Sequence, residues 1–384
     1  MIYLDNAATS NPKPDSVAES MVYFVNNGCA NPGRGAYSLA NEAARLIFEA
    51  RERVQGFFNG GIKSHVVFTA NITESLNLVL KGILSAGDEV IVSSMEHNSM
   101  MRPLRELEAL EVVVKVVPCD PDTGQIDCVD IRAAISPATK LIAINHGSNI
   151  IGTVQPIEEI GKICYNEGIL FLVDSAQTAG VLPIDMQKAN IDFLAFTGHK
   201  SLLGPMGIGG LVLSEKAQRN GIKPLKTGGT GSNSEFETQP NLFPDSLESG
   251  TPNLPGIAGL NAGIAWLQQL GVDRVRVHEQ GLTAYLLERL ATIPNVKLFG
   301  TRNASEQVGV ISFSVEGKDI GELADQLESE YGVCCRAGLH CSPAAHKTMG
   351  TFPEGTIRLS LGVFTTKSQL ESALEAIRAL AQSR

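Results

Sequence analysis

Two side chains of this sequence have the type and surroundings needed for covalent chemistry on an amino compound. Lys200 lies in the segment FTGHKSLLGPMGIGG, between an apolar run and glycines that let backbone pass close to it. A lysine removed from water in this way can become a nucleophile. Asp174 directly follows the apolar run ILFLV. A buried amine that forms a Schiff base and a carboxylate that keeps a pyridine nitrogen protonated are what pyridoxal phosphate requires of a protein. Taken singly, Asp174 is as well explained as a helix cap, and most lysines are solvated surface residues.

A bound phosphate needs donors near a helix start, and the sequence offers such a place. The segment NITE (71–74), with Thr73 as its hydroxyl, supplies free amides at a predicted helix N-terminus whose dipole favours an anion. Thr197 and His199 could add two further donors, and His97 could lie flat against an aromatic ring. A Thr N-cap and an ordinary hydrogen-bonded histidine explain these residues equally well in isolation. Their order along one chain favours a single site.

Composition excludes several classes of protein. The 384 residues carry 31 Lys and Arg against 41 Asp and Glu, a net charge of −10, without a basic run, which argues against nucleic acid or an anionic membrane as partner. The hydrophobic share of 43% and the charged share of 19% exclude a disordered chain. The seven cysteines are odd in number and form no CxxC pair, which favours a reducing compartment over a disulfide framework. With no leader or membrane-spanning pattern in the sequence, we expect a cytoplasmic protein.

Short β-branched runs alternate with helical patterns through the first two thirds of the chain, which is typical of βαβ units around a mostly parallel sheet. We predict seven strands: 65–69, 89–94, 112–117, 140–145, 169–174, 192–196 and 208–213. Apolar spacing of three and four residues predicts helices over 41–58, 73–84 and 156–167. Ligands of such sheets bind beyond the carboxyl ends of the strands, where the polar residues named above follow.

The last third of the chain has a different texture. Residues 227–255 are dense in Gly, Pro, Ser and Asn and predict a long surface segment. Beyond it we expect helices at 256–270 and 320–331 and strands at 308–315 and 356–360, which make a second, smaller α+β domain. The predicted division is an N-terminal segment (1–12) packing near the site, a large α/β domain (13–255) and a small domain (256–384) carrying a cysteine loop.

Nine motifs together resemble the cysteine desulfurases, which are fold type I pyridoxal-phosphate enzymes of the class V aminotransferase group. They run in register from Tyr3 to about Phe364 and read YLDNAAT, NITES, EHNS, HGSN, VDSAQ, TGHK, ESGTPN, RAGLHC and IRLSLG. TGHK with DSAQ is specific to the broad group. GLHC followed by a late arginine narrows the resemblance to desulfurases and the related selenocysteine lyases.

The resemblance implies a role for each candidate residue. Lys200 would carry pyridoxal phosphate as a Schiff base and move the substrate α-proton. The other implied cofactor contacts are Asp174 on the pyridinium nitrogen, Gln177 on the ring hydroxyl, His97 stacked on the ring, and Thr73, Thr197 and His199 on the phosphate. Thr251 would reach the phosphate of a neighbouring subunit, which makes a homodimer part of the site. The implied substrate-binding residues are Asn149, Arg358 and Arg336, with Arg358 gripping the substrate carboxylate through a bidentate fork.

Cys341 decides which reaction is expected. It lies in the loop-like segment GLHCSPAAH, and its thiolate would attack the substrate sulfur and keep it as a persulfide. His340 and Arg336 could lower the pKa of this thiol by stabilising the thiolate. Only 17 positions separate Cys341 from Arg358, so the chain resembles the short-loop second class. We therefore expect a protein sulfur acceptor that comes to the site.

Ordinary interpretations of the cysteines remain beside this one. A cysteine can simply be a buried packing residue, the interpretation we favour for Cys119, Cys128 and Cys164. A zinc site is the other interpretation, with Cys335, His340, Cys341 and His346 as ligands, although their spacing matches no standard finger and we predict no metal. Two departures from the family's second class stand out: Ile72-Thr73 replaces a frequent pair of threonines, and Leu339 gives GLHC instead of GHHC.

The predicted activity is conversion of L-cysteine to L-alanine, with sulfur passed from Cys341 to an acceptor. A selenocysteine lyase is the alternative, and a class V aminotransferase is a weaker one because it needs no thiol. A cofactor-free sulfur-binding or scaffold protein is a hypothesis of another class, disfavoured by the intact Lys200, Asp174 and Arg358. Iron–sulfur cluster assembly is one downstream use among several that the sequence leaves open.

Overall fold

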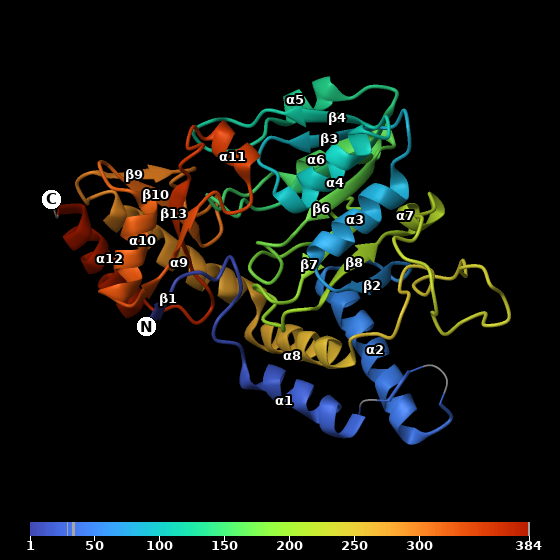
Figure 1. The fold of residues 1–384 in the computed structure, drawn as a ribbon. Helices are drawn as coiled ribbons and strands as arrows, with labels where there is room; N and C mark the ends of the chain where they lie inside the picture. Colours follow the sequence, from blue (N-terminus) through green and yellow to red (C-terminus); the bar gives the residue numbers. More distant parts are fainter. Residues whose placement is uncertain (29, 33–34, 383–384) are drawn as a thin grey trace.

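The computed structural model describes residues 1–28, 30–32 and 35–382, so Cys29 lies outside the described residues. Their largest sheet has seven strands in the order β2-β8-β7-β6-β5-β3-β4 (Figure 1). These strands are β2 (His65–Thr69), β3 (Glu89–Ser93), β4 (Val113–Val117), β5 (Thr139–Asn145), β6 (Leu170–Asp174), β7 (Phe193–Thr197) and β8 (Gly209–Leu213). Each strand lies within one residue of its predicted range at either end, so the seven-stranded α/β fold is confirmed.

Helices cover both faces of this sheet. One face carries α2 (Ser38–Phe57), α5 (Cys128–Ala134), α6 (Ile157–Glu167) and α8 (Leu254–Leu270). The other carries α3 (Ile72–Ile83), α4 (Asn98–Glu108) and α7 (Glu215–Arg219). In β6, Phe171 and Val173 join the first core while Leu170 and Leu172 join the second, as the alternation of a strand requires. Because both faces are buried, the strands appear in the sequence as continuous apolar runs.

The sheet is mostly parallel, with one exception that the chain connections explain. β3 pairs in parallel with β4 and β5, and β6 pairs in parallel with β5 and β7. β8 pairs antiparallel to both β2 and β7. The connection from β7 to β8 is the short loop 198–208, and a parallel crossover needs a dozen or more residues. The carboxyl ends of the parallel strands therefore meet at one edge, as predicted for the site.

A smaller antiparallel sheet follows, with the order β12-β13-β10-β9. Its strands are β9 (Val296–Phe299), β10 (Val310–Val315), β12 (Arg336–Gly338) and β13 (Thr356–Ser360). Its helices are α9 (Val272–Leu290), α10 (Ile320–Ser329), α11 (Pro343–Thr348) and α12 (Lys367–Gln382). Leu286, Phe313, Leu327 and Ile377 belong to the hydrophobic core that α9, α10 and α12 build on this sheet. The predicted smaller α+β unit is thus present.

The N-terminal segment lies against this smaller sheet. β1 (Ile2–Tyr3) pairs in parallel with β11 (Val333–Cys334), and the Asn6 side chain donates a hydrogen bond of 3.0 Å to the Ser360 carbonyl. The chain then runs through α1 (Asp15–Tyr23) and the π-helical turn Phe24–Gly28 toward α2. α8 packs against α1 and α2, as Figure 1 shows. The predicted domain boundary at 255/256 remains a prediction, since α8 itself packs on the larger unit.

The segment before α8 has the irregular conformation that its composition predicts. No helix or strand occurs between α7 and α8 in the described chain. Figure 1 shows this segment as a long excursion beyond β2 and β8. None of the helices in the described ranges is long and apolar enough to cross a membrane.

Candidate active site

A cavity of about 320 Å³ lies at the carboxyl edge of the large sheet. It brings together eight residues predicted from the sequence: Thr73, His97, Asn149, Asp174, Gln177, Thr197, His199 and Lys200. Asn71, Ile72, Ser99, Asn145 and Ala176 complete its lining. The walls come from the ends of β5, β6 and β7 and the starts of α3 and α4. Residues more than a hundred positions apart in the chain therefore face one space.

Lys200 and Asp174 form the electrostatic centre of this cavity. Burial lowers the pKa of the Lys200 amine to about 8, while the Asp174 carboxylate opposes this shift and the Arg358 and Arg336 charges add to it. Burial raises the pKa of Asp174, which is only 2% exposed, and the Ala176 amide and Lys200 partly offset that effect. The Ala176 N–H donates 2.9 Å to Asp174 Oδ1. Near neutral pH, Lys200 is thus much closer to deprotonation than an exposed lysine.

The start of α3 and the end of β7 supply donors for an anion. Asn71 is the N-cap of α3 and its Oδ1 accepts from the Glu74 N–H at 3.1 Å, so the Thr73 hydroxyl is not used as the cap. Thr197 Oγ1 and His199 Nδ1 are buried and have no hydrogen-bond partner among the described residues. Burial and the Lys200 charge lower the pKa of His199 to about 4, so its ring is neutral near pH 7. Polar atoms left unpaired in a cavity wall fit a ligand that satisfies them.

His97 is held by a local hydrogen bond, and Gln177 by one to the N-terminal segment. His97 is the N-cap of α4, and its Nδ1 accepts from the Ser99 N–H at 3.0 Å, which leaves the ring proton on Nε2. Burial and the Lys200 charge lower the pKa of His97 to about 4. Gln177 Nε2 donates 3.1 Å to the Ala7 carbonyl of the N-terminal segment. A neutral, fixed imidazole is suited to stacking on a planar ring.

Arg358 does not line the cavity but contacts its wall. The guanidinium is 2% exposed, its Nη1 donates 2.9 Å to the Asn149 carbonyl, and its Nη2 forms a 2.7 Å ion pair with Asp5 Oδ1. Nε is buried without a partner in the described chain. Arg336 is exposed and lies opposite Arg358 in the pairing of β12 with β13. One N–H of the buried guanidinium therefore has no hydrogen-bond acceptor among the described residues.

Cys341 is exposed at the tip of a loop that is fastened to the cavity wall. Its carbonyl accepts 2.9 Å from the Asn98 N–H at the start of α4. Asn149 Nδ2 donates 2.8 Å to the carbonyl of His340, and Asn149 Oδ1 accepts 2.8 Å from Ser342 Oγ. The Asn149 side chain thus bonds to the residue before Cys341 and to the residue after it, and it also lines the cavity.

His340 does not provide a positive charge to the thiol. Burial and the Arg358 charge lower its pKa to about 2, and its Nε2 lies 3.1 Å from the Thr356 carbonyl. Its ring stands 5.7 Å from that of His346, which is also buried and has its pKa lowered to about 4 by burial. Among the described residues no group of three His, Cys, Asp or Glu side chains could hold a metal ion. Cys119 and Cys164 are buried free thiols, as the packing interpretation predicted, and Cys128 is half-buried.

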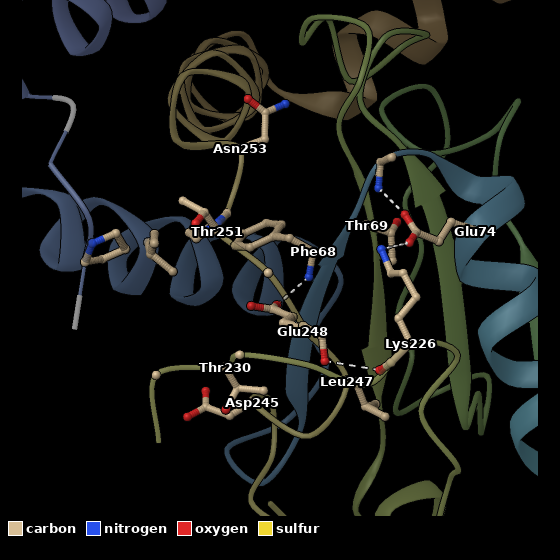
Figure 2. A pocket seen from close by; sticks show the side chains of 18 of the residues that line it. Phe68, Thr69, Glu74, Lys226, Thr230, Asp245, Leu247, Glu248, Thr251 and Asn253 are labelled. Atoms are coloured by element: carbon tan, nitrogen blue, oxygen red, sulfur yellow. Dashed lines mark hydrogen bonds and ion pairs between the residues drawn. The ribbon is translucent and has the colours of Figure 1, made fainter. Parts of the chain in front are cut away.

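Thr251 lies in a different cavity, of about 810 Å³ (Figure 2). Arg51 and Glu248 form a 2.5 Å ion pair at this cavity, and Glu248 Oε1 accepts 2.6 Å from the Phe68 N–H. Glu74 and Lys226, which also line this cavity, form a 2.5 Å ion pair. The two cavities share the start of α3, because 69, 70 and 74 line the larger one and 71–73 the smaller.

Two ionisable residues of the region were not among the predicted site residues. Asp5 lies in the quoted motif YLDNAAT, but its pairing with Arg358 joins opposite ends of the chain. Glu96 is fully buried beside Asp174; burial raises its pKa to about 8, and Ser93 Oγ donates 2.6 Å to it. Glu96 could have been found from the sequence because it follows the strand β3, and polar residues after strand ends are candidates for the site.

Comparisons with known proteins agree with this geometry. A family model described as Aminotransferase class-V matches residues 2–372. The probable cysteine desulfurase of Methanothermobacter thermautotrophicus is 35% identical over 384 residues, covering 99% of this chain and 94% of the relative. The apo cysteine desulfurase structure from Thermococcus onnurineus NA1 superposes with a TM-score of 0.91 at 33% identity, covering 99% of this chain and 94% of that one. The structure of the cysteine desulfurase CsdA from Escherichia coli, in an S-sulfonic acid form, superposes with a TM-score of 0.86 at 30% identity, covering 99% of this chain and 94% of that one. The chain therefore belongs to the class-V aminotransferase family, and within it to the cysteine desulfurases.

Proposed function

We propose that this protein converts L-cysteine to L-alanine with pyridoxal phosphate bound in the cavity of Lys200 and that Cys341 receives the sulfur. The observation that carries the proposal is the meeting of Lys200 and Asp174 in one cavity whose wall, through Asn149, holds the Cys341 loop. An aminotransferase site would need the first two residues but not the loop. The family to which the chain belongs supports the same activity.

The residues present fit this cofactor. Lys200 would form the Schiff base, and Asp174 would face the pyridinium nitrogen. The unpartnered Thr197 Oγ1 and His199 Nδ1 would meet the phosphate together with Thr73 and the first amides of α3. His97 would stack on the ring and Gln177 would bond its hydroxyl. The two buried atoms, which have no partner among the described residues, would thereby gain one each.

Pyridoxal phosphate, when bound, supplies an electron sink for the substrate's α-carbon. Lys200 is suited to take the α-proton because its lowered pKa, about 8, is close to working pH. Arg358 would hold the substrate carboxylate through its free Nε, with Nη2 shared with Asp5. Asn149 uses one of its two amide hydrogens on His340, so the second is free to donate to the same carboxylate.

Cys341 would complete the reaction as a thiolate. Its Sγ attacks the substrate sulfur, a sulfur–sulfur bond forms, and the carbon–sulfur bond breaks with its electron pair left on the carbon fragment. Protonation of that carbon gives alanine, and the persulfide remains on Cys341. Because Cys341 is exposed, a thiol of an acceptor protein could reach the persulfide and take the outer sulfur.

We further propose a homodimer in which Thr251 of the partner subunit completes the phosphate site. Thr251 is exposed in the described chain and lines the larger cavity rather than the one with Lys200. That cavity borders the start of α3. A second copy of the protein bound at this cavity would therefore bring its own residues close to the proposed phosphate. Delivery of sulfur to iron–sulfur cluster assembly in a reducing cytoplasm is one use of such an enzyme.

The experiment that tests the function compares the wild-type holoenzyme with Cys341→Ser. The wild type should release alanine and, with a reductant, sulfide from L-cysteine. The variant should keep the visible absorbance of the cofactor while sulfide release falls by about a hundredfold or more, because the hydroxyl is a far weaker nucleophile than a thiolate. Undiminished sulfide release would remove Cys341 from the mechanism. Loss on L-cysteine with activity kept on L-selenocysteine would favour a selenocysteine lyase.

A further inference from the structure

The hydroxyl of Ser342 makes a contact that its position in the chain does not require. Ser342 stands at the N-cap position of α11, where a serine side chain ordinarily accepts a hydrogen bond from the first turn. No such cap hydrogen bond is formed. The hydroxyl instead donates 2.8 Å to Asn149 Oδ1, and Ser342 is fully buried. The side chain is therefore committed to the cavity wall and not to its own helix.

The same amide holds the other side of Cys341. Asn149 Nδ2 donates 2.8 Å to the His340 carbonyl, so one side chain fixes the residues immediately before and after the cysteine. The two bonds also set the orientation of the amide, because only its oxygen can accept from Ser342 and only its nitrogen can donate to His340. Asn149 in turn lines the cavity that contains Lys200.

The backbone between these anchors is strained. His340 has a φ of 48° and Cys341 a φ of 60°, in the left-handed region that non-glycine residues enter only at a cost in free energy. Such a conformation persists only where surrounding contacts hold it. A backbone hydrogen bond of 2.9 Å from the Ser342 N–H to the Leu339 carbonyl closes the turn. Further contacts are the two bonds to Asn149, the Asn98 N–H on the Cys341 carbonyl at 2.9 Å, and the approach of His340 Nε2 to the Thr356 carbonyl at 3.1 Å.

We propose that Ser342 is a positioning residue for the Cys341 thiol and acts through the Asn149 amide. The proposal rests on the proposed function, since the thiol that it positions is the one assigned to sulfur transfer. Ser342 touches neither the cavity nor the reacting atoms, so it is not a catalytic residue itself. Loss of its hydroxyl leaves Asn149 Oδ1 without a donor among the described residues and removes the side-chain anchor on the C-terminal side of Cys341, while the backbone hydrogen bond from the Ser342 N–H to the Leu339 carbonyl remains.

The test uses three variants of the full-length holoenzyme. Ser342→Ala removes the hydroxyl, Ser342→Thr keeps it, and Ser64→Ala is the matched control. Ser64 is also a buried serine, and its hydroxyl donates 2.9 Å to the Gly61 carbonyl at the opposite end of β2 from the cavity. The measurements are kcat and KM for sulfide release from L-cysteine, the visible absorbance of the cofactor, and hydrogen exchange of peptides covering 338–346.

We expect kcat of Ser342→Ala to fall about tenfold or more, since small misplacements of reacting groups cost rate steeply. KM should rise by a smaller factor than kcat falls, because the proposed contact with the substrate carboxylate uses the same Asn149 amide. Cofactor absorbance should be retained, and Ser342→Thr and Ser64→Ala should keep kcat within about threefold of the wild type. A rise in KM with unchanged kcat would overturn the proposal, because the hydroxyl would then serve substrate binding. Equal losses in Ser342→Ala and Ser342→Thr would overturn it as well.

Hydrogen exchange separates this proposal from the proposed function. Exchange of 338–346 should be faster in Ser342→Ala than in the wild type, whatever the activity of the enzyme. Unchanged exchange would show that the hydroxyl does not anchor the loop. If the wild type releases no sulfur from cysteine, the proposed function fails while this measurement still tests the anchor.

Discussion

Replacement of Thr197 by valine should have opposite effects on the cofactor-free and the cofactor-bound protein. Thr197 ends β7, is 2% exposed, and has a hydroxyl without a partner in the described chain. Valine has the same branched shape and keeps the strand conformation. The change therefore removes one hydroxyl and little else from the site.

The expected magnitudes come from this unpaired atom. A buried polar group without a partner costs about 1–3 kcal/mol, so Thr197→Val should stabilise the cofactor-free protein by about 1–2 kcal/mol. A hydrogen bond to a charged group contributes about 1.5–3 kcal/mol, so the variant should bind pyridoxal phosphate about 10- to 150-fold more weakly. The same hydroxyl is thus expected to destabilise the cofactor-free protein and to stabilise the cofactor-bound one.

The assay is urea unfolding of both forms, together with titration of the cofactor-free protein by visible absorbance. Thr283→Val is the matched control, because Thr283 is fully buried but its Oγ1 donates 2.7 Å to the Glu279 carbonyl. Loss of this hydrogen bond in Thr283→Val should destabilise the cofactor-free and the cofactor-bound protein alike by about 1 kcal/mol. A cofactor-free Thr197→Val that is destabilised like the control, or an unchanged cofactor affinity, would refute the assignment of Thr197 to the phosphate.

Two further predictions concern charged groups. Because burial lowers the pKa of Lys200 to about 8, the neutral amine becomes more abundant as pH rises to that value. The rate at which pyridoxal phosphate attaches to the cofactor-free protein, measured by visible absorbance, should rise by roughly tenfold per pH unit and level off above pH 8. A rate that does not change with pH would contradict this prediction. Asp5→Asn removes the 2.7 Å partner of the buried Arg358, while Asp5 itself is 21% exposed. The free energy of unfolding, measured in urea, should fall by about 1–2 kcal/mol. KM for L-cysteine should fall as well, because Nη2 becomes available to the substrate carboxylate, whereas a raised KM would show that Asp5 helps to bind substrate.

The strands and most of the cavity lining could be predicted because they depend on local patterns. Strands buried on both faces appear as continuous apolar runs, and the residues after them lie at one edge in a parallel sheet. That is why Asp174, Thr197 and Lys200 were found together. The antiparallel pairing of β8 was not predicted, since it depends on the length of the loop before it and not on the apolar pattern.

Contacts between distant segments could not be predicted in this way. The pairing of Asp5 with Arg358 and the hold of Asn149 on His340 and Ser342 arise where the N-terminal segment and the smaller sheet pack on the larger one. Apolar periodicity carries no information about which distant polar groups will meet. The neutral state of His340 likewise follows from burial that its loop-like sequence did not indicate.

The amino-acid sequence by itself determined the seven strands, the edge at which polar residues gather, and the residue types that suit a Schiff base, a phosphate and a thiolate. Tertiary packing alone decided which of these groups remain unpaired, which are neutral, and how the cysteine is held. The physical reason is that side-chain chemistry and backbone preference are local properties, whereas desolvation, ion pairing and hydrogen-bond satisfaction depend on what the rest of the chain places alongside. Burial lowers the pKa of Lys200 to about 8, and the amide of Asn149 forms hydrogen bonds with the residues on both sides of Cys341.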